Sequence, residues 1–298
     1  MKLIHVEASS YCNARCPLCP RNVYGYKVEG VYHETHLDPS TLKNSLIEFT
    51  DRKLVYFNGN LGDPMMNPKI LQLIDVAKCN TSITTNGSIG NEATWKALAG
   101  KNVEVIFSID GLADTNHLYR QDVEWSKLLQ RIKWFIDCGG QAIWKFVLFK
   151  HNSHQQQKAR ALAKKLGFID FVIEDHNRNF GPALHKNGTV SHWILPADNS
   201  KVAGTFDLQS SVKRYRTNNH NYKGPLKDLQ ISCEHLKDES VYIDAQGRIS
   251  PCCYQGFDIP GRPFVHLKDT KKLIENWNTN NCNTVCACLL YTSPSPRD

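Results

Sequence analysis

Three cysteines near the start of the chain have the spacing of a metal-binding loop. Cys12, Cys16 and Cys19 form a C-x3-C-x2-C pattern directly after an apolar run. Three thiolates on one tight loop can hold three corners of an iron–sulfur cubane, whereas clusters ligated only by cysteine use four. A structural zinc site is the alternative, but such sites use paired C-x2-C or Cys/His sets, and no histidine follows at suitable spacing. We therefore expect an iron–sulfur site with one iron open to an outside ligand.

Polar residues also follow the next three apolar runs. The candidates at these positions are Gly62, Asp63, Thr85, Ser108 and Asp110. A hydroxyl or a carboxylate can accept hydrogen bonds from a ligand's hydroxyl or ammonium groups. Each short segment taken alone is equally typical of a turn or a helix cap. Their recurrence at successive strand ends favours a shared binding site.

Apolar periodicity predicts the elements that position these residues. Strands are expected at 3–8, 54–58, 82–85, 103–109, 143–149 and 168–174, and helices at 38–47, 67–77, 91–99, 123–138 and 153–166. Strands that alternate with helices form a parallel sheet with right-handed crossovers. A closed eight-stranded barrel needs about 250 residues, so six units indicate a doubly wound sheet or an incomplete barrel. In both, ligands bind at the carboxyl ends of the strands.

At these residues the chain resembles the radical S-adenosylmethionine (SAM) superfamily. The cysteine loop, the Gly62-Asp63-Pro64 turn, the Thr-Asn-Gly at 85–87 and the Ser-x-Asp-Gly at 108–111 follow the order of that family's motifs. The resemblance implies an α/β fold, a partial (βα)6 TIM-like barrel. It also implies a [4Fe-4S] cluster whose electron cleaves SAM to methionine and a 5'-deoxyadenosyl radical, which abstracts hydrogen from a substrate.

The resemblance also implies roles for individual residues. Cys12, Cys16 and Cys19 would bind the cluster, and Gly62 with Asp63 would receive the methionine ammonium. Thr85 belongs to the Thr-Asn-Gly segment of the SAM site, and Ser108 with Asp110 would lie near the ribose. The backbone of Leu18 would lie near the adenine. Two positions depart from the family pattern, since Leu61 replaces a glycine and Asp63 replaces a glutamate.

A second group of cysteines lies near the end of the chain. It resembles the start of a SPASM or twitch module, which carries auxiliary [4Fe-4S] clusters, and its later C-x2-C run is not intact. The candidate ligands are Cys233, Cys252, Cys253, Cys282 and Cys286. A zinc site is the alternative, because cysteine spacing does not separate iron from zinc. A hairpin is expected at 241–252, turning at 244–247.

These features divide the chain into four parts. We expect a catalytic core at 1–175, an irregular linker with one helix at 176–232, and a truncated SPASM/twitch-like module at 233–287. The last residues, 288–298, resemble a translated sequencing adapter, and we interpret them as an artefact tail. Two isolated cysteines, Cys79 and Cys138, are expected to be small buried side chains.

Composition narrows the class of protein. The chain has 298 residues, 41% hydrophobic and 22% charged, which suits a globular protein and excludes a disordered one. The N-terminus lacks a signal-peptide core, no apolar run approaches the length of a membrane span, and nine of the eleven cysteines cluster as metal ligands do, so we expect a cytoplasmic protein without membrane contact. The net charge of +7 includes no block of like charges and by itself does not indicate nucleic-acid binding.

Three functions remain open at this stage. The first is a radical SAM enzyme that acts on a peptide or protein side chain, reduced by a low-potential donor such as flavodoxin or ferredoxin. The second is a radical SAM enzyme for a small molecule or nucleotide in cofactor biosynthesis. The third is a non-catalytic zinc- or nucleic-acid-binding protein.

Overall fold

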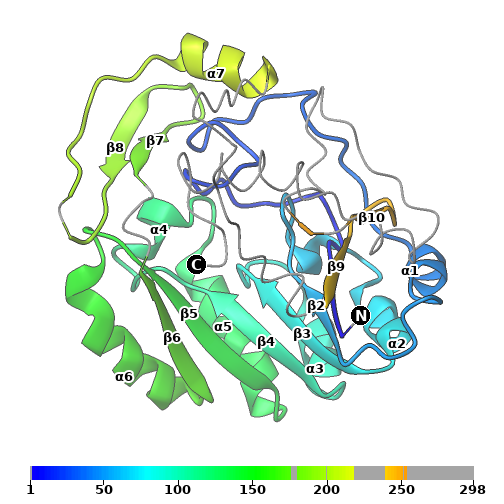
Figure 1. Cartoon of the computed structure of the whole chain (residues 1–298). Helices are drawn as coiled ribbons and strands as arrows, with labels where there is room; N and C mark the ends of the chain where they lie inside the picture. The colour runs from blue at the N-terminus through cyan, green and yellow to red at the C-terminus, as the bar shows by residue number, and fades with distance from the viewer. Residues whose placement is uncertain (1, 176–179, 199, 218–238, 251, 254–298) are drawn as a thin grey trace.

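The structure is a computed structural model, and it describes residues 2–175, 180–198, 200–217, 239–250 and 252–253. Six parallel strands pair in chain order, as Figure 1 shows: β1 (Leu3–Val6), β2 (Leu54–Phe57), β3 (Asn80–Thr85), β4 (Val103–Ser108), β5 (Gln141–Leu148) and β6 (Asp170–Asp175). The helices between them are α1 (Pro39–Ser45), α2 (Ile70–Ala77), α3 (Glu92–Ala99), α5 (Trp125–Asp137) and α6 (Gln156–Leu166). Strands pair consecutively without reversal, so the predicted α/β fold and partial (βα)6 TIM-like barrel are confirmed.

Local signals explain where two of these helices begin and end. Asp38 caps α1 by accepting a hydrogen bond from the Ser40 amide at 2.9 Å, and Pro39 occupies the first helical position. Gly167 ends α6 in the left-handed conformation with φ of 89°, which a glycine adopts without steric cost. Both boundaries match those read from the sequence.

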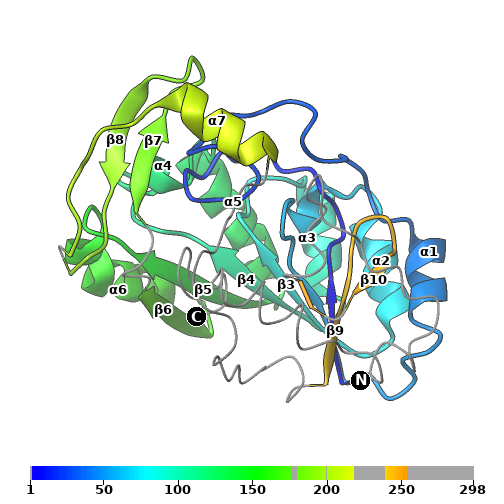
Figure 2. The same ribbon diagram turned by 45° about the horizontal axis from the view of Figure 1, so that its top comes forward.

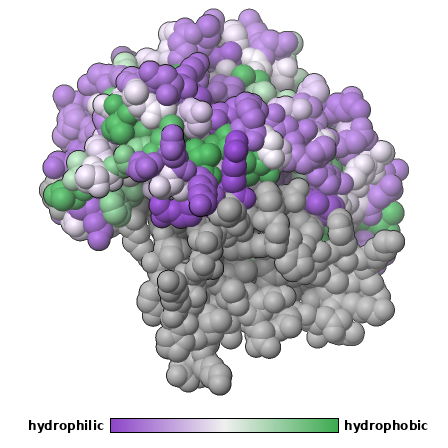
Figure 3. All heavy atoms as spheres, turned by 90° about the horizontal axis from the view of Figure 1, so that it is seen from above, coloured by the Kyte–Doolittle hydropathy of each residue, from purple (hydrophilic) through white to green (hydrophobic). Residues whose placement is uncertain are grey.

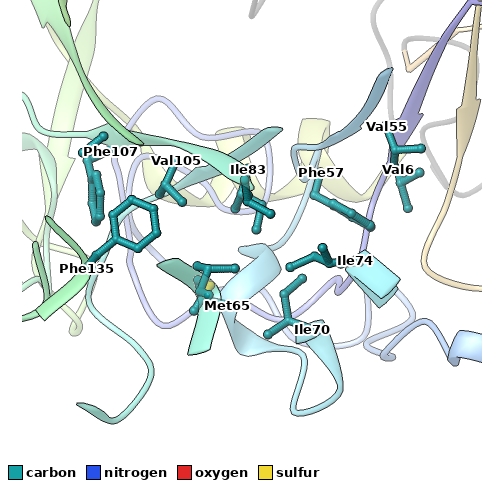
Figure 4. Close-up of a cluster of buried hydrophobic side chains, with 14 of the residues drawn as sticks. Val6, Val55, Phe57, Met65, Ile70, Ile74, Ile83, Val105, Phe107 and Phe135 are labelled. Atoms are coloured by element: carbon teal, nitrogen blue, oxygen red, sulfur yellow. The ribbon is translucent and has the colours of Figure 1, made fainter. Parts of the chain in front are cut away.

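One face of the sheet is apolar and is covered by helices. Figure 4 shows Val6, Phe57 and Ile83 in neighbouring strands, with Ile70 and Ile74 of α2 packed against them. These side chains are all buried, and the same face continues through the buried residues of β4 and β5. Because side chains alternate along a strand, this apolar face leaves the other set pointing inward.

The inner face of the sheet is polar instead. Pairs across neighbouring strands join His5 to Tyr56, Tyr56 to Ser82, and Ser82 to Glu104. A hollow of about 520 Å³ lies on this face at the amino-terminal halves of the strands. Closed barrels of this type fill their interior with branched apolar residues. The inner face of this open sheet instead carries polar side chains and a hollow.

The C-terminal hairpin belongs to the same sheet. Strands β9 (Ser240–Ile243) and β10 (Ile249–Ser250) pair antiparallel, which confirms the hairpin expected at 241–252. The sequence did not reveal that β9 also pairs in parallel with β1, with Leu3 opposite Ser240. Figure 2 shows β9 alongside the first strand at the edge of the sheet. The division of the chain at residue 233 stays a prediction.

The segment expected to be irregular contains further elements. Strands β7 (Gly181–Leu184) and β8 (Val190–Ile194) form an antiparallel hairpin, followed by α7 (Leu208–Thr217). The short β7 and the exposed start of β8 give no clear two-residue alternation, so periodicity missed both strands. A short helix, α4 (Asn116–Tyr119), was also missed.

The described surface shows no membrane-spanning element. None of the helices in the described ranges has the length and apolar character needed to cross a bilayer. Where Figure 3 is coloured, the face seen from above is largely hydrophilic with smaller apolar areas between. Cys138, expected to be buried, is exposed at the C-cap of α5, whereas Cys79 is half-buried.

We predict that Phe107→Ala lowers the free energy of unfolding by about 3–5 kcal/mol, because it removes a fully buried ring from a close-packed cluster. The Phe107 ring lies 5.4 Å from that of Trp95 and 6.1 Å from that of Phe135. Urea denaturation measures the loss. The matched control is Ile47→Ala at a side chain that is 62% exposed, which should change stability by less than about 0.5 kcal/mol. Equal losses in the two variants would contradict the packing argument.

Candidate functional site

The cysteine loop begins where β1 ends and folds into a compact turn. The Cys19 amide donates to the Cys16 carbonyl at 3.0 Å, and the Asn22 amide donates to the Cys19 carbonyl at 3.2 Å. Cys16 is buried, whereas Cys12 and Cys19 are half-buried, and none of the three is in a disulfide. The loop therefore gathers three thiols at the carboxyl edge of the sheet.

Two side chains donate hydrogen bonds to these sulfurs. Asn86 Nδ2 lies 3.7 Å from Cys12 Sγ, and Arg120 Nη1 lies 3.7 Å from Cys16 Sγ. Burial raises the pKa of Cys19 to about 11 and also raises that of Cys16, although Arg120 acts to lower the latter. The free thiols therefore hold their protons, and a bound metal would have to displace them.

The donor set suits an iron–sulfur cluster. In the described part of the chain, no three His, Cys, Asp or Glu side chains are grouped to hold a single metal ion. Hydrogen bonds to cysteine sulfurs are a typical feature around iron–sulfur clusters, where they tune the reduction potential. Cys12, Cys16 and Cys19 are the residues that would hold such a cluster.

Arg120 is a component of the site that the sequence did not suggest. Its Nε donates to Asp110 Oδ2 at 2.5 Å while Nη1 faces Cys16. Burial alone would lower the pKa of Arg120, but the Asp110 carboxylate beside the guanidinium raises it above its usual range. Arginine is mostly exposed in proteins, so no sequence signal marks this one as partly buried beside a thiol.

Asp110 is fully buried and its carboxylate is already engaged. Besides Arg120, it accepts a hydrogen bond from the Val147 amide at 2.6 Å through Oδ1. The Asp110 carbonyl accepts from Asn152 Nδ2 at 2.9 Å. Asp110 thus fixes the end of β4 against β5, and Ser108 beside it is buried as well. Their contact with a ribose stays a prediction.

Asp63 joins the ends of β2 and β3. Its Oδ1 accepts from Thr85 Oγ1 at 2.8 Å and from the Met65 amide at 2.9 Å, and its Oδ2 accepts from the Asn86 amide at 2.8 Å. Burial raises the pKa of Asp63, and these hydrogen bonds oppose the rise. The side chain predicted to receive the methionine ammonium is therefore also a structural cap. Its ligand contact, like that of Thr85, stays a prediction.

Gly62 occupies a position that admits no side chain. A Cβ at Gly62 would lie 1.9 Å from the Ser9 carbonyl oxygen and 2.7 Å from that of Tyr11. The next amide, that of Asp63, donates to the Tyr11 carbonyl at 2.8 Å. The 58–63 segment thus lies directly on the chain that leads into the cysteine loop.

Glu7 is a second component that the sequence did not suggest. It is 3% exposed, and its Oε1 accepts from the amides of Leu61 at 2.7 Å and Gly62 at 3.0 Å. The one signal in the sequence was an acid near the end of a mainly apolar strand. Such an acid is buried with the strand, and a buried carboxylate requires hydrogen-bond donors from other segments.

Leu18 packs against a small apolar cluster of Val147, Phe149, Ala183 and Ile194, the last two of which belong to the β7–β8 hairpin. Its backbone contact with adenine stays a prediction. Of the second cysteine group, Cys252 and Cys253 are described and buried, whereas Cys233, Cys282 and Cys286 lie outside the described residues.

Direct hydrogen bonds thus join all four predicted segments at one edge of the sheet. Asp63 connects 58–63 to 85–87, Asn86 connects 85–87 to Cys12, and Arg120 connects Asp110 to Cys16. Segments separated by up to about a hundred residues therefore form one constellation around three thiols.

Comparisons with known proteins agree with this arrangement. No family model matches the chain. SuiB of Streptococcus suis bound to SAM has a TM-score of 0.58 at 17% identity, over 92% of this chain and 65% of SuiB. The anSMEcpe structure with bound AdoMet and Cp18Cys peptide has a TM-score of 0.58 at 15% identity, over 97% of this chain and 84% of that protein. This chain therefore shares the fold of these two SAM-bound proteins, in agreement with the partial TIM-like barrel expected from the sequence.

A sequence relative is known from Pyrococcus furiosus. It is the tungsten-containing aldehyde ferredoxin oxidoreductase cofactor-modifying protein, 27% identical over 116 residues. That match covers 38% of this chain and 32% of the relative, so the chain spans about a third of the curated relative.

We predict that Asp110→Asn lowers the free energy of unfolding by about 3–5 kcal/mol, because an amide nitrogen or a neutral oxygen would face the Arg120 guanidinium at a fully buried position. Chemical denaturation measures the change. Asp122→Asn is the matched control, since the Asp122–Arg15 pair is 35% and 20% exposed and should contribute about 1 kcal/mol or less. A loss at Asp110 as small as at Asp122 would show that the buried pair does not stabilise the site.

Proposed function

We propose that the chain is a radical SAM enzyme that uses Cys12, Cys16 and Cys19 to bind a [4Fe-4S] cluster. The observation that carries the proposal is the hydrogen-bonded constellation of the C-x3-C-x2-C loop with three strand-end segments in a partial barrel. When bound, the cluster supplies the electron that cleaves SAM, and the chemistry belongs to the cofactors. The protein's task is to bind, orient and shield them.

The described residues support specific parts of that task. Arg120 and Asn86 would donate to the cluster thiolates, and Asp110 would keep Arg120 oriented. Gly62 and Asp63 would receive the methionine end of SAM, and Ser108 would face the ribose. Preorganised donors of this kind require little rearrangement when charge develops.

A peptide or protein side chain is the proposed substrate. The support is that SuiB is known in complex with the precursor peptide SuiA, at a TM-score of 0.57, and anSMEcpe with the Cp18Cys peptide. A low-potential flavodoxin or ferredoxin would supply electrons from solution. Cys233, Cys252, Cys282 and Cys286, with Cys253 as the alternative to Cys252, would form an auxiliary [4Fe-4S] site in a SPASM/twitch-like module.

A small-molecule substrate is the second candidate. The Pyrococcus furiosus relative is named as a cofactor-modifying protein, which favours a cofactor precursor. The two candidate functions share the SAM chemistry. They differ only in the substrate that would bind opposite SAM in the barrel.

We predict that the chain, reconstituted anaerobically with iron and sulfide and reduced with dithionite, forms 5'-deoxyadenosine from SAM, detected by mass spectrometry. Cys16→Ala should reduce this cleavage to background and lower the iron content, because the cluster loses a ligand. Cys138→Ala, at an exposed thiol far from the loop in sequence, is the control and should retain cleavage. Full cleavage by Cys16→Ala, or zinc without iron in the wild-type protein, would refute the assignment.

We predict that co-expression with neighbouring genes yields a modified peptide whose mass shift depends on Cys16. The comparison is between wild-type and Cys16→Ala cells, with peptides and small metabolites analysed in parallel. A Cys16-dependent change confined to a metabolite would select the small-molecule candidate instead.

A further inference from the structure

We propose that Glu7 is a positioning residue that holds the Leu61–Gly62 backbone in place for SAM, and that Tyr242 of β9 holds Glu7 in turn. The inference rests on the proposed function, which assigns the 58–63 segment to the methionine end of SAM. It adds a residue outside every motif that the sequence suggested, and it gives the C-terminal hairpin a role in the SAM site.

Three hydrogen bonds converge on this carboxylate. Glu7 Oε1 accepts from two consecutive amides, those of Leu61 and Gly62, and Oε2 accepts from the Tyr242 hydroxyl at 2.5 Å. The Glu7 amide also donates to the Ile243 carbonyl at 2.8 Å, so its backbone is fixed along β9. Glu7 and Tyr242 are 3% and 0% exposed, so both partners are withdrawn from bulk solvent.

The two amides depend on this acceptor. The Leu61 amide is buried and the Gly62 amide is partly buried where they donate to Glu7. Buried backbone amides without an acceptor are costly, so the segment would move if the carboxylate were removed. Glu7 therefore determines where the Gly62 backbone lies relative to the cysteine loop.

A second contact joins the same segment to the C-terminal hairpin. Asn60 Nδ2 donates to the Cys253 carbonyl at 2.8 Å. Residues of the 58–63 segment and of the 244–246 turn, together with Ser10, His33, Thr35 and Arg248, line a partly open cavity of about 20 Å³ beside Glu7, which has room for about one water molecule. The hairpin thus contacts the segment at two points, through Tyr242 by way of Glu7 and through Cys253 directly.

The alternative is that Glu7 only stabilises the fold. The two roles differ in what they predict for local motion and ligand affinity. A purely structural residue changes global stability and leaves SAM affinity unchanged, whereas a positioning residue changes exchange of the amides it holds together with SAM affinity. The test therefore measures amide exchange and SAM affinity together, and a variant destabilised elsewhere in the fold serves as the control for global stability.

The test compares four variants of the reconstituted protein. Glu7→Ala removes the acceptor. Glu7→Gln is the conservative variant, since its amide oxygen can accept from both backbone amides while its nitrogen donates to the Tyr242 oxygen. Tyr242→Phe removes one hydrogen bond at constant shape. Ile132→Ala, at a fully buried side chain of α5, is the control for destabilisation elsewhere.

Amide hydrogen exchange at Leu61 and Gly62 is the first readout, and the dissociation constant of SAM, with KM and kcat for its cleavage, is the second. Glu7→Ala should accelerate exchange at both amides and weaken SAM binding about 10- to 100-fold, as loss of one or two hydrogen bonds to a charged acceptor predicts. Tyr242→Phe should weaken binding about 3- to 10-fold. Glu7→Gln should restore both readouts to near wild-type values, and Ile132→Ala should change neither.

Several outcomes overturn the proposal. Unchanged exchange in Glu7→Ala shows that Glu7 does not hold the segment, and faster exchange with unchanged SAM affinity shows that the segment does not position SAM. If Glu7→Ala fails to fold, a SAM affinity of Tyr242→Phe equal to that of the wild-type protein also overturns the proposal. A wild-type protein that does not bind SAM refutes the proposed function, whereas the exchange readout still decides the contact with Glu7.

Discussion

The site depends on the burial of three carboxylates at the carboxyl edge of one sheet. Glu7, Asp63 and Asp110 are 3%, 4% and 0% exposed. A buried carboxylate is very costly unless donors surround it. Each of these three obtains donors from a neighbouring segment, namely the amides of Leu61, Asn86 and Val147. The loops that must meet around the cysteines are thus tied to one another by the requirement to satisfy buried charge.

The thiols add negative charge to the same edge when they lose their protons. Arg120 lies between Asp110 and Cys16, so one cation faces both an acid and a sulfur. Because Asp110 fixes the guanidinium through Nε, the orientation toward Cys16 does not depend on the sulfur's charge. Such support from outside the ligand shell is how proteins keep metal ligands oriented.

Much of the fold was predictable from the sequence, because it is encoded in local periodicity. The six strands and five helices follow from apolar spacing, and caps such as Asp38 and Gly167 mark helix boundaries. The pairing of β9 with β1 was not predictable, since it joins residues more than two hundred positions apart and no local pattern specifies a partner strand. The short β7 and the exposed start of β8 likewise left too weak an alternation to detect.

The site was predictable in part for a related reason. Cysteine spacing and strand-end positions identified the segments that the structure joins. They did not reveal Glu7 or Arg120, because a single acid or base carries no spacing signal, and its burial depends on partners elsewhere in the chain. The prediction that Cys138 is buried was wrong. Cys138 is the C-cap of α5, and the apolar spacing of a helix does not determine whether its last residue faces the core or the solvent.

The parallel pairing of β1 with β9 has a consequence for how this chain folds. Leu3 lies opposite Ser240, so the first strand has one neighbour from β2 and gains the other only after some 240 residues have been synthesised. Contacts of such long sequence separation form slowly, and an unpaired strand edge is a site for association with other chains. During synthesis at about 5–20 residues per second, β1 would keep one open edge for about ten seconds or longer. The first strand is therefore open to association with other chains until β9 has been made and has paired with it.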